Sequence, residues 1–250
     1  MPTTLHLPAL ALKDYLNAHR WLWRTGHWKW LLWPFFLSIL LFPLYIWSIV
    51  WSTDGLTSWI LLGLDWPAEG WRYWLIWPFI LVIGLIFGYI LLKKIIMLLC
   101  APLNAFLAEA VINDHLGQAV SGTWRDFMIS LGRAIGLTLI AVIAGLVSTV
   151  LLLLLGIVPV VGAIAAVMIG AVIQGFLTAW GFFDPVYERS GLSIGQGFRR
   201  SLRYSPVLLG NGVPFVFLFQ IPILGWTLAP SYGTVAGALT ALRLQQQDTP

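Results

Sequence analysis

Charged residues are scarce in this chain, and long stretches of it contain none. Only 10% of its 250 residues are Asp, Glu, Lys or Arg, whereas an average soluble domain has about 25%. Charge is absent from four runs, residues 30–53, 73–92, 134–183 and 204–242. A helix of about 20 apolar residues crosses the hydrocarbon core of a bilayer. The shortage of charge therefore excludes a soluble domain and predicts an all-α polytopic membrane protein.

Residues that carry redox, metal or nucleophilic chemistry are also few. Cys100 is the only cysteine, so no disulfide can form within the chain. The histidines show no metal-ligand spacing, and phosphate-binding and zinc-protease motifs are missing. The stretch 191–195 reads GLSIG, an esterase pattern, but no strand precedes it. Ser193 and Gln196 instead predict a helix capping box. We therefore expect no enzyme, no metal and no cofactor.

The positive charges that are present follow the topology rule of membrane proteins. No basic tail or basic patch interleaved with aromatics exists, so the lipid bilayer rather than nucleic acid is the expected partner. Of the 14 basic residues, all but Arg72 fall on one side if both termini are cytoplasmic. Tryptophans mark two membrane interfaces, the first with Trp21, Trp23, Trp28, Trp30 and Trp33 and the second with Trp47, Trp51, Trp59, Trp66, Trp71, Trp74 and Trp77.

Residues 9–24 have the pattern of an amphipathic helix. Apolar and aromatic side chains recur at helical spacing, and polar ones take the other side. The first set is Leu12, Tyr15, Leu16, His19, Leu22 and Trp23; the second is Lys13, Asp14, Asn17, Arg20 and Arg24. This pattern predicts an interfacial helix that lies on the membrane with its apolar face toward lipid.

Two full spans are expected at residues 30–53 and 73–100, joined by a loop on the outer side. The pair Ala101-Pro102 predicts a break or bend at the end of the second span, because proline lacks an N–H and restricts the residue before it. The polar stretch 104–133 then predicts two short cytoplasmic-side helices with a loop near residues 114–122.

Two further runs predict helical hairpins. Residues 134–183 divide at Gly156, Pro159 and Gly162 into two helices with an apolar tip, and Asp184-Pro185 is expected to end them. Residues 204–242 are interrupted by Pro206, Gly210, Gly212, Pro214, Pro222, Gly225 and Pro230. Interrupted helix at membrane depth is tolerated where protein or a water-filled cavity satisfies the backbone, so this run predicts a broken re-entrant hairpin.

Three stretches together resemble a known family. After the second span comes APLNAFLAEAV, after the long hairpin FFDPVYERSGLSIGQGFRRSLR, and near the end IPILGWTLAPSYGTVAGALTAL. In that order they resemble the CysZ-type sulfate permeases and the wider etoposide-induced transmembrane family, over roughly residues 12–243. The resemblance implies a helical protein of the bacterial inner membrane whose hairpins, 134–183 included, penetrate only part way. It also implies a homo-oligomer that takes up sulfate for cysteine biosynthesis without a nucleotide-driven motor.

By the same resemblance, an anion binds where the first membrane helix begins, at a glycine, the N–H groups after it and two neighbouring arginines. By this resemblance, Gly26 occupies the position of the family's glycine, and Lys29 occupies that of the second arginine. Trp28 stands at the position of the first arginine, and His27 replaces an apolar residue. The first N–H groups of a helix have no intrahelical acceptor and attract anions. The departures matter, since lysine offers a point charge and tryptophan one neutral donor.

Each candidate has a second interpretation. Trp28, Lys29 and their neighbours also fit an interfacial belt with a snorkelling lysine. Lys93 and Lys94 interrupt an apolar helix, which indicates either a functional site or snorkelling, and snorkelling is favoured. A group of three arginines, Arg199, Arg200 and Arg203, fits either the mouth of an anion path or contacts with lipid phosphates. For the whole chain, the alternative to an oxyanion permease is a non-transporting membrane scaffold or assembly protein of the same family.

Overall fold

The computed structural model describes residues 7–67, 70–117 and 124–248, and these residues form helices and turns without strands. Its elements are α1 (Leu7–Arg24), the 3-10 helix η2 (His27–Leu31), α2 (Leu32–Gly63), α3 (Trp71–Leu116), α4 (Trp124–Gly156), α5 (Val161–Arg189), α6 (Ile194–Arg203), α7 (Ser205–Leu218) and α8 (Leu224–Asp248). Four helical segments are long and apolar enough to cross a membrane: His27–Gly63, Trp71–Leu116, Met128–Gly156 and Val161–Arg189. The predicted all-α polytopic membrane fold is confirmed.

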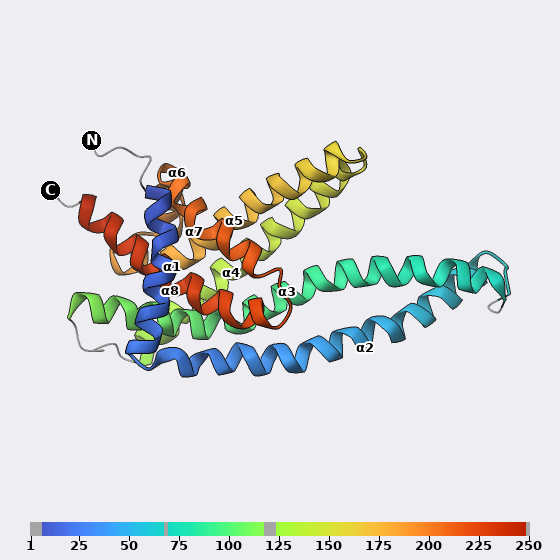
Figure 1. The fold of residues 1–250 in the computed structure, drawn as a ribbon, viewed down its shortest axis with the longest axis horizontal. Helices are drawn as coiled ribbons and strands as arrows, with labels where there is room; N and C mark the ends of the chain where they lie inside the picture. The colour runs from blue at the N-terminus through green and yellow to red at the C-terminus, as the bar shows by residue number, and fades with distance from the viewer. Residues whose placement is uncertain (1–6, 68–69, 118–123, 249–250) are drawn as a thin grey trace.

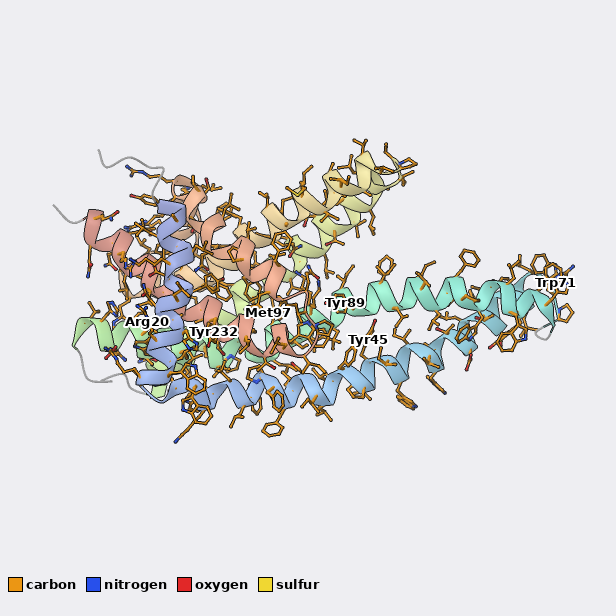
Figure 2. The ribbon with its side chains drawn as sticks, in the orientation of Figure 1. Arg20, Tyr45, Trp71, Tyr89, Met97 and Tyr232 are labelled. Atoms are coloured by element: carbon orange, nitrogen blue, oxygen red, sulfur yellow. The ribbon has the colours of Figure 1, made fainter. Side chains whose placement is uncertain are left out.

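Three helical hairpins extend from one body toward the same side (Figure 1). The α2–α3 hairpin reaches furthest, α4–α5 is shorter, and α7–α8 is the shortest. Helix α1 runs roughly perpendicular to α2 and ends at its base, and the beginning of α1 and the end of α8 lie on the side away from the hairpin tips. Figure 2 shows Trp71 at the far end of α2–α3 and Tyr89 beside the tip of α7–α8.

Helix α1 buries one face against protein and leaves part of its predicted apolar face exposed. Ala11, Asp14 and Ala18 are fully buried at helical spacing, and α1 packs on α7 and α8. Leu12 and Leu16, which were predicted to face lipid, are exposed, whereas Leu22 of the same predicted face is fully buried. The physical reason is that alanines let helices approach closely, while Asp14 finds partners on α8. The exposed leucines remain available to lipid.

Tyr15 and Asp14 hold α1 to the other helices by hydrogen bonds. The Tyr15 hydroxyl donates to the carbonyl of Asn211 on α7. Burial raises the pKa of the Tyr15 hydroxyl, so it remains a donor. Asp14 accepts from Thr240 of α8 at 2.8 Å. These polar contacts explain why a helix predicted to rest only on lipid is anchored to protein.

The first two membrane helices are longer than the predicted spans. Helix α2 continues past residue 53 to Gly63, and Asp54 within it accepts hydrogen bonds from Tyr73 and Trp77 of α3. The outer loop predicted between the spans is therefore mostly helix. These contacts satisfy Asp54, which sequence reasoning had placed at the beginning of that loop.

The prediction at Ala101-Pro102 was a break or a bend, and the break is wrong. Helix α3 runs through Pro102 to Leu116, and Ala101 and Leu103 on either side are buried. Proline removes one donor from the helix ladder, and packing holds the surrounding turns in place. The first short helix predicted within 104–133 is thus the end of α3, and the second belongs to α4. The predicted loop near 114–122 includes residues 118–122, which lie outside the described residues.

Two other predicted interruptions are wrong as well. Helix α5 passes through Asp184-Pro185 and ends at Arg189, because Asp184 is buried and paired with Arg133. Helix α8 continues through Pro230 to Asp248. Helix α7 is short: its 14 residues span about 21 Å, less than the hydrocarbon core of about 30 Å. The capping box predicted at Ser193 and Gln196 is confirmed at the start of α6.

The tips of α4–α5 and α7–α8 are built on the same turn. Residues 155–162 and 218–225 share the pattern Leu-x-x-x-Pro-x-x-Gly. In each turn the residue after proline is β-branched and left-handed: Val160 has φ 61° and Ile223 has φ 60°. Such a conformation is a true outlier for a β-branched residue and is kept only where the surroundings impose it.

The last glycine of each turn is imposed by a close backbone approach. A Cβ on Gly162 would lie 2.2 Å from the carbonyl oxygen of Leu155, and one on Gly225 would lie 1.9 Å from that of Leu218. No side chain fits at such distances. The chain therefore uses one compact reversal twice, and both hairpins end in an uncharged tip.

Candidate functional site

The turn between α1 and η2 presents free backbone donors. Gly26 is left-handed, with φ 77°, and it redirects the chain from α1 into η2 and α2. Within the described residues, no backbone carbonyl or side chain accepts a hydrogen bond from the N–H groups of His27 or Trp28. Those groups stand at the first turn of the first long apolar segment, where the helix dipole favours negative charge.

Aromatic stacking fixes the side chains around this turn. The His27 ring stacks on Trp21 with centroids 4.8 Å apart, and the Trp28 ring stacks on Trp23 at 5.5 Å. His27 Nδ1 is also hydrogen-bonded to the Thr25 hydroxyl at 2.7 Å. The arrangement leaves the free N–H groups on a rigid turn, with Trp28 contributing ring surface where the family has a cation.

Lys29 is the cation of this turn. Its side chain is exposed, and in the parts of the chain described no carboxylate oxygen lies within 4.0 Å of its ammonium. One carboxylate is in the neighbourhood: Asp114, at the end of α3, accepts from the indole N–H of Trp21 at 2.8 Å. Asp114 is thus held by Trp21 of α1 and does not pair with Lys29 within the described residues.

The three arginines of α6 lie away from this turn. Helix α6 packs on α5 and α7, whereas η2 packs on α1, α2 and α8. In Figure 1, α6 lies near the beginning of α1, whereas η2 follows the end of α1. Arg200 stacks over the ring of Tyr187 and Arg203 over that of Tyr204, while Arg199 is exposed. The structure therefore does not bring the arginines together with Gly26 and Lys29.

Two adjacent lysines hold two different hairpins. Lys93 donates to the side-chain oxygen of Gln220 at 2.8 Å and lies 4.6 Å from the ring centroid of Tyr89. Lys94 donates to the side-chain oxygen of Gln174 at 2.7 Å. Gln220 is in the α7–α8 turn and Gln174 is on α5. Both ammonium groups therefore contact protein amides, which does not support the snorkelling interpretation of this pair.

Sequence reasoning missed the two glutamines. Gln174 is the only amide side chain in the uncharged run 134–183, and Gln220 sits between Phe219 and Ile221 in another. A lone amide in an apolar run was the available signal, because such a group needs a partner at membrane depth. Its partner, a lysine many residues away, cannot be read from local spacing.

An ion cluster lies at the polar end of α4 and α5. Arg133 makes two hydrogen bonds to Asp184, at 2.7 and 2.8 Å, and its Nε lies 3.9 Å from Glu188. Ser130 donates to Glu188 at 3.1 Å. Bidentate arginine–carboxylate pairs of this kind are strong and directional. The cluster ties α4 to α5 where the hairpin meets the body.

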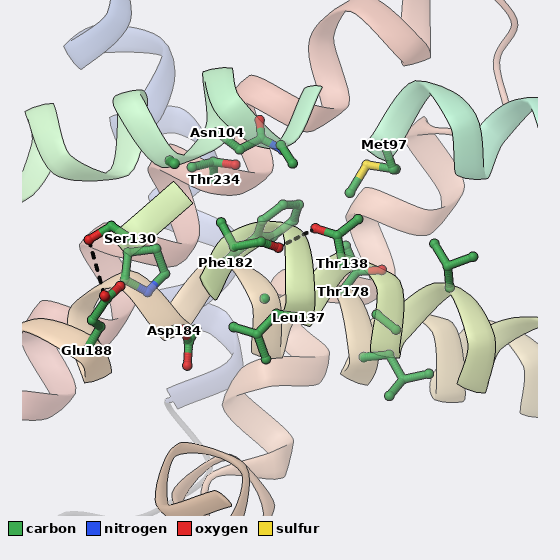
Figure 3. A pocket seen from close by; sticks show the side chains of 18 of the residues that line it. Met97, Asn104, Ser130, Leu137, Thr138, Thr178, Phe182, Asp184, Glu188 and Thr234 are labelled. Carbon is green, nitrogen blue, oxygen red and sulfur yellow. Dashed lines mark hydrogen bonds between the residues drawn. The ribbon is translucent and has the colours of Figure 1, made fainter. Parts of the chain in front are cut away.

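A cavity of about 170 Å³ connects this cluster with the lysine. It lies between α3, α4, α5 and α8 (Figure 3), and its lining includes Lys94 and Gln174 as well as Ser130 and Glu188. Within the described residues, no group of three His, Cys, Asp or Glu side chains is placed to hold a metal ion. The polar groups of the cavity are therefore suited to an ion or small polar molecule held by hydrogen bonds and charge.

The fold defines a polytopic helical membrane protein with free helix-start donors at the beginning of its first long apolar segment and a cavity that carries several polar groups between its helices. A family model described as Sulfate transporter CysZ/Etoposide-induced protein 2.4 matches residues 15–230. The chain belongs to this family, and the resemblance found in the sequence is confirmed. It is thus a multi-pass membrane protein of a sulfate-transporter type.

Proposed function

We propose that this protein is a permease or channel for a small oxyanion, with sulfate taken up for cysteine biosynthesis as its first candidate. We place it in the bacterial inner membrane as a homo-oligomer with both termini in the cytoplasm. Family membership supports the transport class. The beginning of α1 and the end of α8 lie away from the three hairpin tips, which agrees with the bias of basic residues toward one side.

The free N–H groups of His27 and Trp28 carry this proposal, together with the unpaired ammonium of Lys29. We propose that Gly26, His27, Trp28 and Lys29 form the first binding site for the anion. Gly26 turns the chain so that the donors face outward, and Lys29 adds Coulomb attraction. His27 and Trp28 contribute main-chain donors, and their stacked rings keep the turn rigid.

Lysine at this position makes the proposed site weaker than an arginine pair. Its ammonium is a hydrated point charge, and it cannot form the bidentate contact that a guanidinium makes with a tetrahedral oxyanion. We therefore expect modest affinity at this turn. The arginines of α6, Arg199, Arg200 and Arg203, are proposed as the cytoplasmic mouth of the anion path, because their charges lie on the side of the termini.

Uptake of radiolabelled sulfate into liposomes that contain the purified protein tests this proposal. We expect an initial uptake rate well above that of protein-free liposomes, and competition by unlabelled selenate but not by chloride. Uptake equal to that of empty liposomes under an inward sulfate gradient would contradict transport.

The second candidate, a non-transporting scaffold or assembly protein, is favoured by one observation. Trp28 stacks on Trp23 at the position where the family has an arginine, so part of the anion site has been replaced by an aromatic contact. If the protein is a scaffold, we expect no sulfate flux. We also expect a partner protein to stay bound during purification from the native membrane. The liposome measurement separates the two candidates.

A further inference from the structure

The cavity between α3, α4, α5 and α8 is long, and polar side chains are spaced along its largely apolar lining. On α5, its lining residues include Gln174 and Glu188, which are separated by about 21 Å of helix at 1.5 Å per residue. Threonine and asparagine side chains lie between these two ends. In Figure 3, Asn104 and Thr234 lie on the side formed by α3 and α8, with Thr138 and Thr178 on the side of α4 and α5. The cavity thus reaches from the ion cluster to membrane depth.

The deep end of the cavity carries a positive charge that has no counter-ion among the described residues. Lys94 donates to the neutral amide of Gln174. Across the described residues, no carboxylate oxygen lies within 4.0 Å of its ammonium. A half-buried charge among apolar helices is costly unless it is paired or hydrated. Lys93, the next residue, adds a second positive charge outside the lining, so the local field favours an anion.

The backbone is shaped to admit this lysine. Gln174 donates from its amide nitrogen to the carbonyl of Gly145 on α4. A Cβ on Gly145 would lie 2.9 Å from Lys94 Nζ and 2.9 Å from Gln174 Nε2. Gly145 therefore leaves the space in which the ammonium and the amide meet. Because both groups keep further donors, they can bind a ligand without giving up this contact.

Two polar atoms in the middle of the cavity lack a partner. The hydroxyl of Thr234 is buried, with 1% of the residue exposed, and neither it nor the side-chain oxygen of Asn104 has a hydrogen-bond partner in the described part of the chain. Buried polar groups are almost always satisfied, by protein, by water or by a ligand. Their position between Lys94 and the ion cluster indicates a hydrated or ligand-occupied interior.

We propose that the oxyanion binds a second time inside this cavity, with Lys94 as its cation and Gln174, Asn104 and Thr234 as neutral hydrogen-bonding groups. This inference rests on the proposed function and adds to it a site at membrane depth. The carboxylates are segregated at the other end, where Arg133 neutralises Asp184. An anion is therefore attracted to the Lys94 end of the cavity and repelled from the Glu188 end.

A crystal structure with selenate tests the site directly, because selenate is a tetrahedral dianion with an anomalous signal. We expect an anomalous peak within hydrogen-bond distance of Lys94 Nζ. A peak beside Gly26 without one at Lys94 would overturn the inference and leave the proposed function standing. A peak at Lys94 in a protein without sulfate flux would keep this site and refute transport. Absence of a peak at both positions would refute the site at Lys94 and the site at Gly26.

Sulfate binding to variants gives an independent measurement. Lys94→Met removes the proposed cation. We expect the affinity of the cavity site for sulfate to fall at least about tenfold, the effect of losing a hydrogen bond to a charged group. Lys13→Met is the control, because it removes the same charge from an exposed position on α1 that lies outside the cavity lining. Lys94→Arg should keep most of the affinity. Equal affinity of wild type and Lys94→Met would overturn the inference.

Thr234→Val separates binding from folding, since it deletes an unpartnered hydroxyl and nearly conserves shape. We expect sulfate affinity to fall about threefold to tenfold, as for a neutral hydrogen bond. Thermal stability without sulfate should stay equal or rise, because no protein partner is lost. Unchanged sulfate affinity in a normally folded Thr234→Val protein would remove Thr234 from the site. If both Thr234→Val and Lys94→Met bind sulfate as tightly as wild type, the cavity site does not exist.

Discussion

Asp14, near the beginning of the chain, forms an ion pair with Arg243, near its end. Oδ1 of Asp14 lies 2.8 Å from Nη2 of Arg243. Asp14 is fully buried, whereas the arginine side chain is 39% exposed. The carboxylate also accepts from Thr240 and Asn17. The pair fastens α1 to α8 on the side where the chain ends meet, and α1 leads into the turn at Gly26.

The two members of this pair should differ in their effect on stability. Arg243→Met leaves a buried carboxylate without its cation, and we expect a loss of about 2 kcal/mol, below the ~3–5 kcal/mol of fully buried pairs because Arg243 is partly exposed. Asp14→Asn leaves only a half-exposed guanidinium and should cost less, about 1 kcal/mol. Thermal unfolding in detergent measures both. A larger loss for Asp14→Asn than for Arg243→Met would contradict this account.

Lys29→Ala tests the turn between α1 and η2. Because the Lys29 ammonium is exposed, we expect only a threefold to tenfold loss of sulfate affinity, the effect of about 1 kcal/mol. Lys13→Ala provides the matched control, since Lys13 is also exposed and lies on α1. Equilibrium binding of labelled sulfate to the purified protein measures the change. Equal affinities for wild type and Lys29→Ala would remove this lysine from the site.

Trp28→Arg should strengthen binding at the same turn. An arginine there can offer two parallel N–H donors to an oxyanion, whereas the indole offers one neutral donor. We expect sulfate affinity to rise about tenfold, as for a charge-assisted hydrogen bond. The cost is the lost ring contact with Trp23. Trp28→Leu, which loses the ring without adding charge, is the control, and an equal gain in that variant would refute the electrostatic explanation.

Much of the fold could be predicted from the sequence because the bilayer imposes simple rules. Uncharged runs of sufficient length become helices, since every backbone group at membrane depth must be satisfied within the segment. The capping box at Ser193 and Gln196 was also predictable, because capping depends on residues three apart. Helix ends were less predictable: Pro102 and Pro185 are local breakers, but packing of Ala101 and the Asp184 ion pair carry the helices past them.

Contacts between distant residues could not be predicted. Asp14 was assigned to the polar face of α1 by spacing alone, and its partner Arg243 is on the last helix. The glutamine partners of Lys93 and Lys94 were missed for the same reason. The repeated hairpin turn could have been found, because its pattern recurs at 155–162 and 218–225. Its left-handed residues, however, are β-branched, and no local preference predicts that conformation.

Gly225→Ala should disrupt the tip of the α7–α8 hairpin. The new Cβ would lie 1.9 Å from the backbone oxygen of Leu218, so the turn must open. Opening pulls Gln220 away from Lys93 and Tyr89, and we expect a loss of about 3 kcal/mol or more. Gly136→Ala is the control: a Cβ there meets nothing within 4 Å, and alanine should stabilise α4 by up to about 1 kcal/mol. Thermal unfolding in detergent compares the two, and equal stability of both variants would show that the turn tolerates a side chain.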